Sequence, residues 1–308
     1  MAIQSPASVW QRLLGAVHDR TAHLSPTARG LLWTIVAGLL FSVLNAVLRA
    51  LSMNIDPFQS QVLRYSLGLV VLLPVILKNG LAAYKPRQIG GQFTRGGFHT
   101  LGLCLWFTAL PQIPLADMTA IGFTGPIFIM IGAYIFFKEP MRWERWVATL
   151  LGFSGVMFVV GPQLSFGAGG GGLPHLIMLA SVPMFAASFL LTKALTRYES
   201  AGTILVWQSI TVSIFSLPLA CMNWQWLEAW QWASFLGCGA LGSAGHYCLT
   251  RSFQAADISS TQSAKFLELI WSALMGWLLF ADLPTLSTLL GGTLISASTI
   301  WLARRESR

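Results

Sequence analysis

The chain has 308 residues, of which 55% are hydrophobic and 10% are Asp, Glu, Lys or Arg, and its mean hydropathy is +0.64. A soluble protein of this length needs a charged surface, so the composition excludes a soluble globular fold and indicates an integral membrane protein. The formal net charge is +8. The basic residues sit at the ends of apolar segments, where they indicate membrane topology rather than nucleic-acid binding.

The first part of the chain, residues 1–28, lacks the continuous apolar core of a secretory signal. Val9, Trp10, Leu13 and Leu14 recur at helical spacing. This spacing is typical of a short amphipathic helix on a membrane surface. We expect residues 1–28 to form a cytoplasmic segment of this kind.

Ten segments follow that are long and apolar enough to cross a bilayer, because about 20 residues of helix cover the hydrocarbon thickness of about 30 Å. Lipid offers the backbone no hydrogen-bond partners, so such segments must be helical. The predicted fold class is an all-α integral membrane protein with ten transmembrane helices. The predicted segments are residues 29–50, 57–78, 91–110, 116–137, 143–161, 173–195, 202–222, 230–252, 257–280 and 285–303.

Basic residues are concentrated in every second connection between these segments. Lys78, Lys85 and Arg87 follow the second segment, and Lys138 and Arg142 follow the fourth, whereas the intervening connections lack Lys and Arg. Positively charged loops stay in the cytoplasm, so both ends of the chain are expected on the cytoplasmic side of the inner membrane. This arrangement requires an even number of crossings, which ten satisfies.

The chain also reads as two related halves. The stretch FSVLNAVLRAL (41–51) matches FAASFLLTKAL (185–195) at an offset of about 144 residues, and a Gly-rich connection (166–174) separates the halves. Residues 29–161 and 173–303 would each hold five segments. An odd number reverses the direction of entry, so the halves are predicted to be inverted repeats, an architecture typical of secondary transporters.

These features resemble the ten-helix EamA-like branch of the drug/metabolite transporter superfamily. The marks are Arg95, the stretch TGPIFIMIGAYIFFKEP (124–140) and its second-half counterpart LELIWSALMGWLLFADLP (267–284), which contains Glu268 and Asp282. Leu269 stands where the family has proline, which predicts a straighter ninth helix. The resemblance implies a secondary transporter with a midplane cavity. The aromatic content is similar to that of YddG-type aromatic amino-acid exporters.

Ionisable residues inside apolar segments are costly, so each is a candidate for function. Lys265 and Glu268 are three residues apart on one helical face. They either satisfy each other as a packing pair, or bind the carboxylate and ammonium of a zwitterion. A proton-coupling role for Glu268 is a further alternative, and transport that simply follows the substrate gradient is another.

Further candidates for substrate binding lie near the middle of other segments. A lone histidine is either a hydrogen-bonded packing residue or a ligand contact, and aromatic rings suit planar or cationic substrates. No second histidine stands three or four residues from another, so no metal site is expected, and no cofactor either. The four cysteines are expected as free, buried thiols. The full candidate set is Asn45, His99, Trp106, Phe185, Ser188, His246, Lys265, Glu268 and Trp271.

The function expected from the sequence is export of small metabolites, amino acids and aromatic ones above all, by alternating access around a midplane cavity. Its partners would be the small-molecule substrate and the lipid bilayer, without nucleic acid. A multidrug or cationic-compound exporter is the alternative. An intramembrane enzyme is disfavoured because the sequence holds no catalytic motif such as His-Glu-x-x-His, and a channel because it holds no row of polar pore-lining residues.

Overall fold

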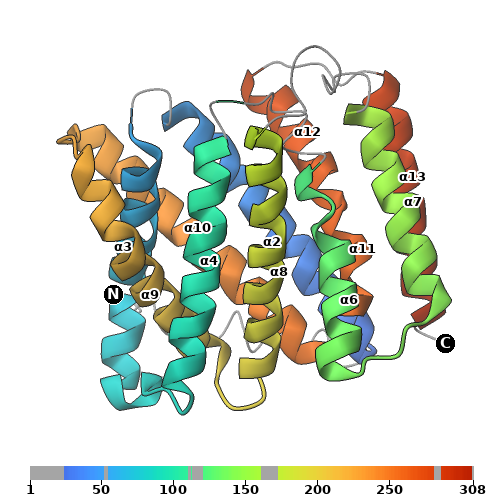
Figure 1. Ribbon diagram of the computed structural model, residues 1–308, viewed down its shortest axis with the longest axis horizontal. Helices are drawn as coiled ribbons and strands as arrows, with labels where there is room; N and C mark the ends of the chain where they lie inside the picture. The colour runs from blue at the N-terminus through green and yellow to red at the C-terminus, as the bar shows by residue number, and fades with distance from the viewer. Residues whose placement is uncertain are drawn as a thin grey trace, which may run out of the picture.

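A computed structural model of the protein describes residues 24–51, 55–109, 112, 121–160, 173–280 and 286–306. Within these residues the regular structure is helical throughout (Figure 1). Three features named above lie outside the described residues. These are the amphipathic stretch before residue 24, most of the Gly-rich connection, and Asp282.

Ten helices in the described part of the chain are 13 residues or longer. The first five are α2 (Pro26–Leu51), α3 (Pro57–Asn79), α4 (Ile89–Ala109), α6 (Gly125–Phe137) and α7 (Trp143–Val160). The second five are α8 (Leu173–Leu195), α9 (Ala201–Met222), α10 (Ala229–Ala255), α12 (Leu267–Phe280) and α13 (Leu286–Glu306). Three short elements complete the set, namely η1 (Leu81–Tyr84), η3 (Ser259–Thr261) and α11 (Gln262–Lys265).

Four of the described helices are long and apolar enough to cross a membrane by length and composition. These are Pro26–Leu48 within α2 and the whole of α3, α8 and α9. Gly125–Phe137 and Leu289–Leu302 are apolar but shorter. The structure therefore has a helix in each of the ten predicted segments, although six of them do not meet both criteria.

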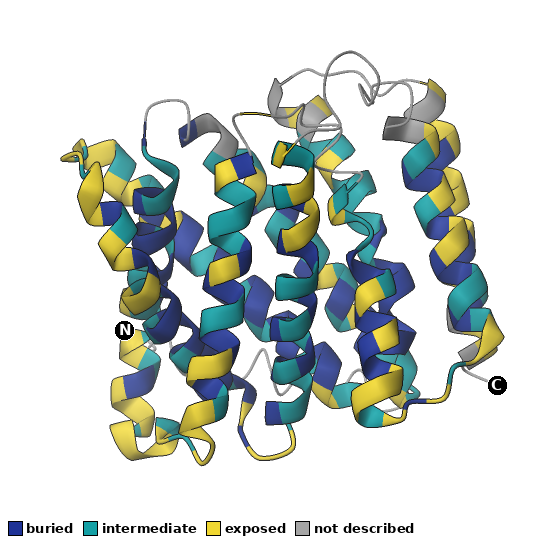
Figure 2. Ribbon diagram, in the orientation of Figure 1, coloured by how far each residue is buried: buried dark blue, intermediate teal, exposed yellow. Residues whose placement is uncertain are grey.

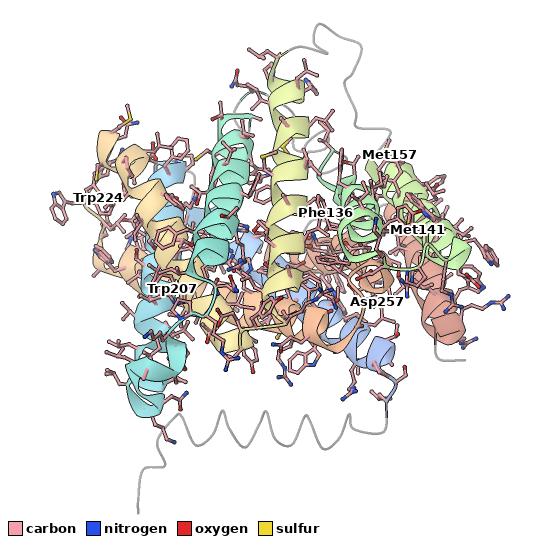
Figure 3. The ribbon with its side chains drawn as sticks, turned by 60° about the horizontal axis from the view of Figure 1, so that its bottom comes forward. Phe136, Met141, Met157, Trp207, Trp224 and Asp257 are labelled. Atoms are coloured by element: carbon pink, nitrogen blue, oxygen red, sulfur yellow. The ribbon has the colours of Figure 1, made fainter. Side chains whose placement is uncertain are left out.

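The connections alternate between the two ends of the bundle (Figure 1). The start of α2, the connections α3–α4, α6–α7 and α8–α9, and the end of α13 lie at one end, which we call the basic end. The connections α2–α3 and α9–α10 lie at the opposite end. At the basic end, Trp207 of α9 donates a hydrogen bond to the carbonyl of Tyr84 in η1 at 2.9 Å (Figure 3).

The ninth segment is interrupted, although Leu269 stands where the family has proline. It begins as η3, continues as α11, and is interrupted at Phe266 before α12. The backbone tightens there, because the Phe266 N–H donates to the Ser263 carbonyl at 3.4 Å and the Leu269 N–H to the Phe266 carbonyl at 3.1 Å. The Phe266 ring fills the space beside Gly152 and packs 5.7 Å from the ring of Phe123. Tertiary packing therefore shapes this segment without a proline.

The fourth segment is also interrupted in its described part. Residues 121 and 122 are helical, Phe123 and Thr124 form a turn, and α6 starts only at Gly125. The continuous helix predicted over 116–137 is therefore wrong for the described residues, because a turn precedes Pro126, whose ring suits the start of a helix rather than its middle.

The packing of the bundle reverses the polarity of a soluble protein. Arg95, His99 and Gln208 are buried, while Phe136 and Met222 are more than 70% exposed. Exposed residues line the outer faces of the helices and buried ones the inner faces (Figure 2). Apolar side chains on the outside suit a lipid environment. The helix pairs in closest contact are α2 with α10, α4 with α8, α3 with α9, and α7 with α13.

Candidate functional site

A cluster of buried polar side chains lies where α3, α4, α8, α9 and α10 meet. Its members are hydrogen-bonded to one another across helices from both halves of the chain. We call it the central cluster. It comprises Arg64, Tyr65, Arg95, His99, Ser188, Thr192, Gln208 and His246.

Two histidines form the middle of the central cluster. The rings of His99 and His246 are 5.6 Å apart between centroids. The Tyr65 hydroxyl lies 2.8 Å from Nε2 of His99 and 3.3 Å from Nε2 of His246, so it bridges the two rings. Oγ of Ser188 is 3.3 Å from Nδ1 of His99. The candidates His99, Ser188 and His246 are 58 to 147 positions apart in the sequence, and the fold brings them together.

Arg95 is buried in α4 and is held by groups without a negative charge. Its Nε donates to Oγ1 of Thr192 at 2.6 Å and its Nη1 to the Ile204 carbonyl at 3.1 Å. Its Nη2 donates to Oε1 of Gln208. All three guanidinium nitrogens are therefore engaged, which allows a buried cation in the absence of an ion pair.

Two phenylalanines at matching positions of the two halves pack against the histidines. The ring of Phe41 stands edge-on to His246 at 5.0 Å, and the ring of Phe185 stands edge-on to His99 at 5.5 Å. The Phe41 ring also approaches a glycine closely, because a Cβ on Gly245 would lie 2.8 Å from this ring. The candidate Phe185 therefore has a counterpart, Phe41, that the repeat pattern had already paired with it.

The ninth segment supplies a second group of polar side chains. Nζ of Lys265 lies 4.6 Å from the centre of the Phe189 ring, and Phe189 in turn packs edge-on against His99 at 6.4 Å. Among the described ion pairs, none joins Lys265 to Glu268. The indole Nε1 of Trp271 is buried and has no hydrogen-bond partner. Lys265, Glu268 and Trp271 thus present polar groups that no direct pairing occupies.

Two candidates lie away from the central cluster. Asn45 is exposed on α2, one turn beyond Phe41. Trp106 packs against Phe107 at 4.8 Å and against Ala109 and Met178, in an apolar cluster at the C-terminal end of α4. Their part in binding stays a prediction.

Five members of the central cluster were not among the candidate residues, namely Arg64, Tyr65, Arg95, Thr192 and Gln208. Arg64 and Gln208 are 144 positions apart, which is the offset that relates the two halves. Both in fact reach Nε2 of His246, at 3.3 Å each. The shared offset was the available signal, because it relates two side chains that reach the same histidine.

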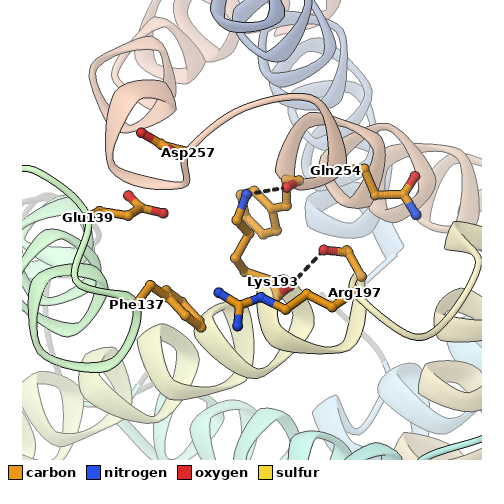
Figure 4. A pocket seen from close by; sticks show the side chains of 8 residues that line it. Phe137, Glu139, Lys193, Arg197, Gln254 and Asp257 are labelled. Carbon is orange, nitrogen blue, oxygen red and sulfur yellow. Dashed lines mark hydrogen bonds between the residues drawn. The ribbon is translucent and has the colours of Figure 1, made fainter.

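A cavity lies at the basic end (Figure 4). It has a volume of about 460 Å³ and is bounded by the ends of α6, α8 and α10. Lys193 there donates to the carbonyls of Phe253 and Ala256 at 2.6 Å each. The lining residues are Phe137, Glu139, Lys193, Thr196, Arg197, Phe253, Gln254 and Asp257.

One wall of this cavity is a hydrogen-bonded clamp between the halves. The Glu139 carboxylate accepts from the backbone N–H groups of Ile258 and Ser259 at 3.1 Å each and from the Ser259 hydroxyl at 2.5 Å. Arg145 donates to Oγ of Ser259 at 2.7 Å and pairs with Asp257 at 3.1 Å. The α6–α7 connection of the first half is thereby fixed to the start of the ninth segment.

The four cysteines are free, and two of them, Cys238 and Cys248, are buried. Cys221 is exposed, which corrects the expectation that all four are buried, because its position on α9 faces outwards. Within the described residues, no group of three or more His, Cys, Asp or Glu side chains is placed to hold a metal ion.

Comparison with known proteins places this architecture in a family. A model of the EamA-like transporter family matches residues 28–161 and again residues 172–304. The chain belongs to the EamA-like transporter family. It is therefore a membrane transporter, and the two matches cover both halves.

Individual relatives show which members of the family are similar. A riboflavin transporter of Rhizobium johnstonii is 32% identical over 282 residues, which are 91% of this chain and 92% of the relative. An S-adenosylmethionine uptake transporter of Rickettsia felis is 26% identical over 91% of this chain and 94% of its own length. A crystal structure of another protein covers 91% of this chain and 99% of its own with a TM-score of 0.75; at 18% identity it shows the fold alone.

These names do not support the likeness to YddG-type aromatic amino-acid exporters. They describe transport of riboflavin and uptake of S-adenosylmethionine, and neither amino-acid transport nor an export direction. The expectation of amino-acid export rested on aromatic content, which is high in many helical membrane proteins because rings pack well and anchor the helices in the membrane.

Proposed function

We propose that this EamA-family transporter carries a small, planar, uncharged heteroaromatic metabolite of the riboflavin type across the inner membrane by alternating access. The observation that carries the proposal is the central cluster, in which polar groups from both halves meet between two aromatic walls. Hydrogen-bonding groups between aromatic rings suit a flat, polar ring system. The riboflavin transporter that is 32% identical supports this choice of substrate.

The alternating-access part of the proposal treats residues 29–161 and 173–303 as inverted repeats. The most extensive helix contacts support this, because they correspond when each helix is replaced by its counterpart in the other half. The pair α2–α10 corresponds to α8–α4, α2–α12 corresponds to α8–α6, and α3–α9 and α7–α13 each correspond to themselves. Phe41 on His246 and Phe185 on His99 follow the same exchange.

Charge separates the two substrate classes named among the relatives. S-adenosylmethionine carries a positive sulfonium and a net positive charge, whereas riboflavin is neutral near pH 7. Among the described residues, the cations Arg64, Arg95 and Lys265 and the carboxylate of Glu268 lie around the site. A net positive surrounding repels a cation in a low-dielectric interior. The balance favours the neutral substrate and disfavours a cationic-compound transporter.

The two cavities support a state in which the midplane is closed. Beside His246 the free volume is about 10 Å³, which is room for about one water molecule. The cavity at the basic end is far larger, at about 460 Å³. We propose that substrate reaches the central cluster when the halves separate, and that the basic end faces the cytoplasm because Lys and Arg gather there. The clamp of Glu139, Ser259, Arg145 and Asp257 would then act as the inner hinge.

Flux measurements on purified protein in liposomes test the proposal. Labelled riboflavin, S-adenosylmethionine, tryptophan and a lipophilic cation are each offered to liposomes with and without protein. We expect riboflavin to equilibrate faster only when protein is present, and an excess of riboflavin inside to drive counterflow. Faster flux of tryptophan or of the cation, with none of riboflavin, would instead restore the amino-acid or multidrug alternative.

A further inference from the structure

The hydrogen bonds of the central cluster have an uneven balance of donors and acceptors. Nε2 of His246 lies 3.3 Å from each of three groups that can donate, namely Nη2 of Arg64, Oη of Tyr65 and Nε2 of Gln208, and the Gln208 nitrogen is also 3.4 Å from Nδ1 of the same ring. A guanidinium nitrogen can only donate, so this Nε2 must accept and carries one lone pair in the ring plane. One lone pair cannot satisfy three donors with good geometry.

The orientation of Gln208 is fixed by Arg95. The Arg95 guanidinium donates to Oε1 of Gln208, so the amide oxygen is occupied and the amide NH₂ must face the histidines. That NH₂ lies 3.5 Å from Nε2 of His99 and 3.3 Å from Nε2 of His246. Arg95 is itself anchored by Thr192 and the Ile204 carbonyl, so it cannot turn away. Arg95 therefore acts as a positioning residue for Gln208.

Other donors around the site are also without acceptors. Nε of Arg64 and Nε1 of Trp271 are buried and have no hydrogen-bond partner. The Lys265 ammonium lies over the face of Phe189 rather than against a carbonyl or carboxylate. An unsatisfied buried donor is costly, more so in a membrane interior, so a surplus of donors is a surplus of binding capacity for acceptors.

We propose that the central cluster selects its substrate by the acceptor edge of a heteroaromatic ring, the edge that carries carbonyl oxygens and unprotonated ring nitrogens. The donors that read this edge are Gln208, Tyr65 and Arg64, with Gln208 oriented by Arg95. This inference rests on the proposed function and narrows its substrate class. A ring system with several C=O and C=N acceptors fits these donors. A ring that presents N–H groups or a cation to the cluster does not fit, because the donors of the cluster cannot hydrogen-bond to other donors.

Competition between ring analogues tests the inference. Unlabelled riboflavin, 1-deazariboflavin and 5-deazariboflavin compete with labelled riboflavin for uptake into liposomes that contain the protein. Each deaza analogue keeps the shape of the ring but replaces one nitrogen acceptor by C–H. Loss of one hydrogen bond corresponds to about fivefold to tenfold in affinity. We expect at least one analogue to compete about fivefold or more less well than riboflavin with the wild-type protein.

Gln208→Glu provides the matched variant. It keeps the shape of the side chain, places a carboxylate beside Arg95, and removes both N–H donors. We expect weaker riboflavin uptake and loss of the preference for riboflavin over its deaza analogues. Gln112→Glu makes the same chemical change at an exposed position beyond Ala109, the last residue of α4, and should leave the preference unchanged.

Arg95→Met tests positioning separately, because it frees the Gln208 amide to turn over. We expect it to lower the preference between analogues, which a purely structural role would not alter; if this variant fails to fold, Gln208→Glu carries the test alone. Equal competition by all three ring systems, or an unchanged preference in Gln208→Glu, would overturn the inference and leave riboflavin transport standing. Absence of riboflavin uptake by the wild-type protein would overturn the proposed function and the inference with it.

Discussion

At the scale of single residues, the central cluster replaces water as the partner of its own polar groups. Tyr65, His99, Gln208 and His246 are each less than 8% exposed, yet each reaches at least two other polar side chains. In an interior without water, a polar group left unpaired costs several times more than the net gain from a pairing. Removing one member should therefore disturb its neighbours as well as the substrate.

Tyr65→Phe removes the hydroxyl that bridges the two histidines and leaves the ring in place. We expect a loss of stability of about 1 kcal/mol and a larger relative loss of riboflavin flux, because both Nε2 atoms lose the same partner. Thermal unfolding in detergent and flux in liposomes measure the two effects. Full flux in Tyr65→Phe would show that the hydroxyl serves packing alone.

No described ion pair joins Lys265 to Glu268, so removing either charge breaks no direct contact between the two. We expect Lys265→Ala and Glu268→Ala to fold and to lower transport, as read from the yield of monodisperse protein and from flux. A variant that simply fails to fold would support the packing alternative. Flux of the wild-type protein with and without a pH gradient separates coupling from passive transport, since unchanged flux excludes proton coupling through Glu268.

At the scale of the helices, close backbone approach holds α3 against α10. A Cβ on Gly239 would lie 2.5 Å from the backbone nitrogen of Gly68 and 2.8 Å from the carbonyl carbon of Leu67. Backbone atoms cannot rotate away, so these helices would have to separate. Small residues at helix crossings allow such contacts in membrane proteins.

Gly239→Ala is expected to lower stability by about 1–3 kcal/mol, measured as the melting temperature of the purified protein. Gly237→Ala is the matched control on the same helix, because a Cβ there would have nothing within 4 Å. We expect Gly237→Ala to be neutral or slightly stabilising. Equal melting temperatures for both variants would mean that α3 and α10 do not meet as closely as described.

The helices were predictable from the sequence because their apolar runs must be helical in lipid. The bounds of α3, α8 and α9 differ from the predicted 57–78, 173–195 and 202–222 by one residue at most. The interruption at Phe266 was not predictable, because it depends on space beside Gly152, which lies more than 100 positions away in the chain. Local composition carries no information on that contact.

The site was predictable only in part, for a related reason. His99 and His246 stood out because ionisable residues are rare in apolar segments. Tyr65 and Gln208 did not, because a tyrosine or a glutamine near the middle of a helix is unremarkable until the fold shows which face turns inwards. Asn45 and Trp106 were selected on type and depth, and neither criterion reports the direction of a side chain.

At the scale of the whole molecule, both halves contribute to the central cluster and to the basic end. The most extensive helix contacts occur in corresponding pairs, α2–α10 with α8–α4 and α2–α12 with α8–α6, which is the pattern expected of two related halves. The free volume near His246 is too small for a ring, which means that the described state is closed at its centre. Under the proposed alternating access, transport requires the halves to move apart around the central cluster.

Accessibility of one introduced cysteine tests this most directly. Ser188→Cys is made in a chain whose four native cysteines are replaced, and vesicles of known orientation are treated from either side with a membrane-impermeant thiol reagent. We expect Cys labelling from both sides in turn, slowed by riboflavin, since Ser188 lies 3.3 Å from His99 in the shared centre. Labelling from one side only, or labelling that riboflavin leaves unchanged, would contradict alternating access around the central cluster.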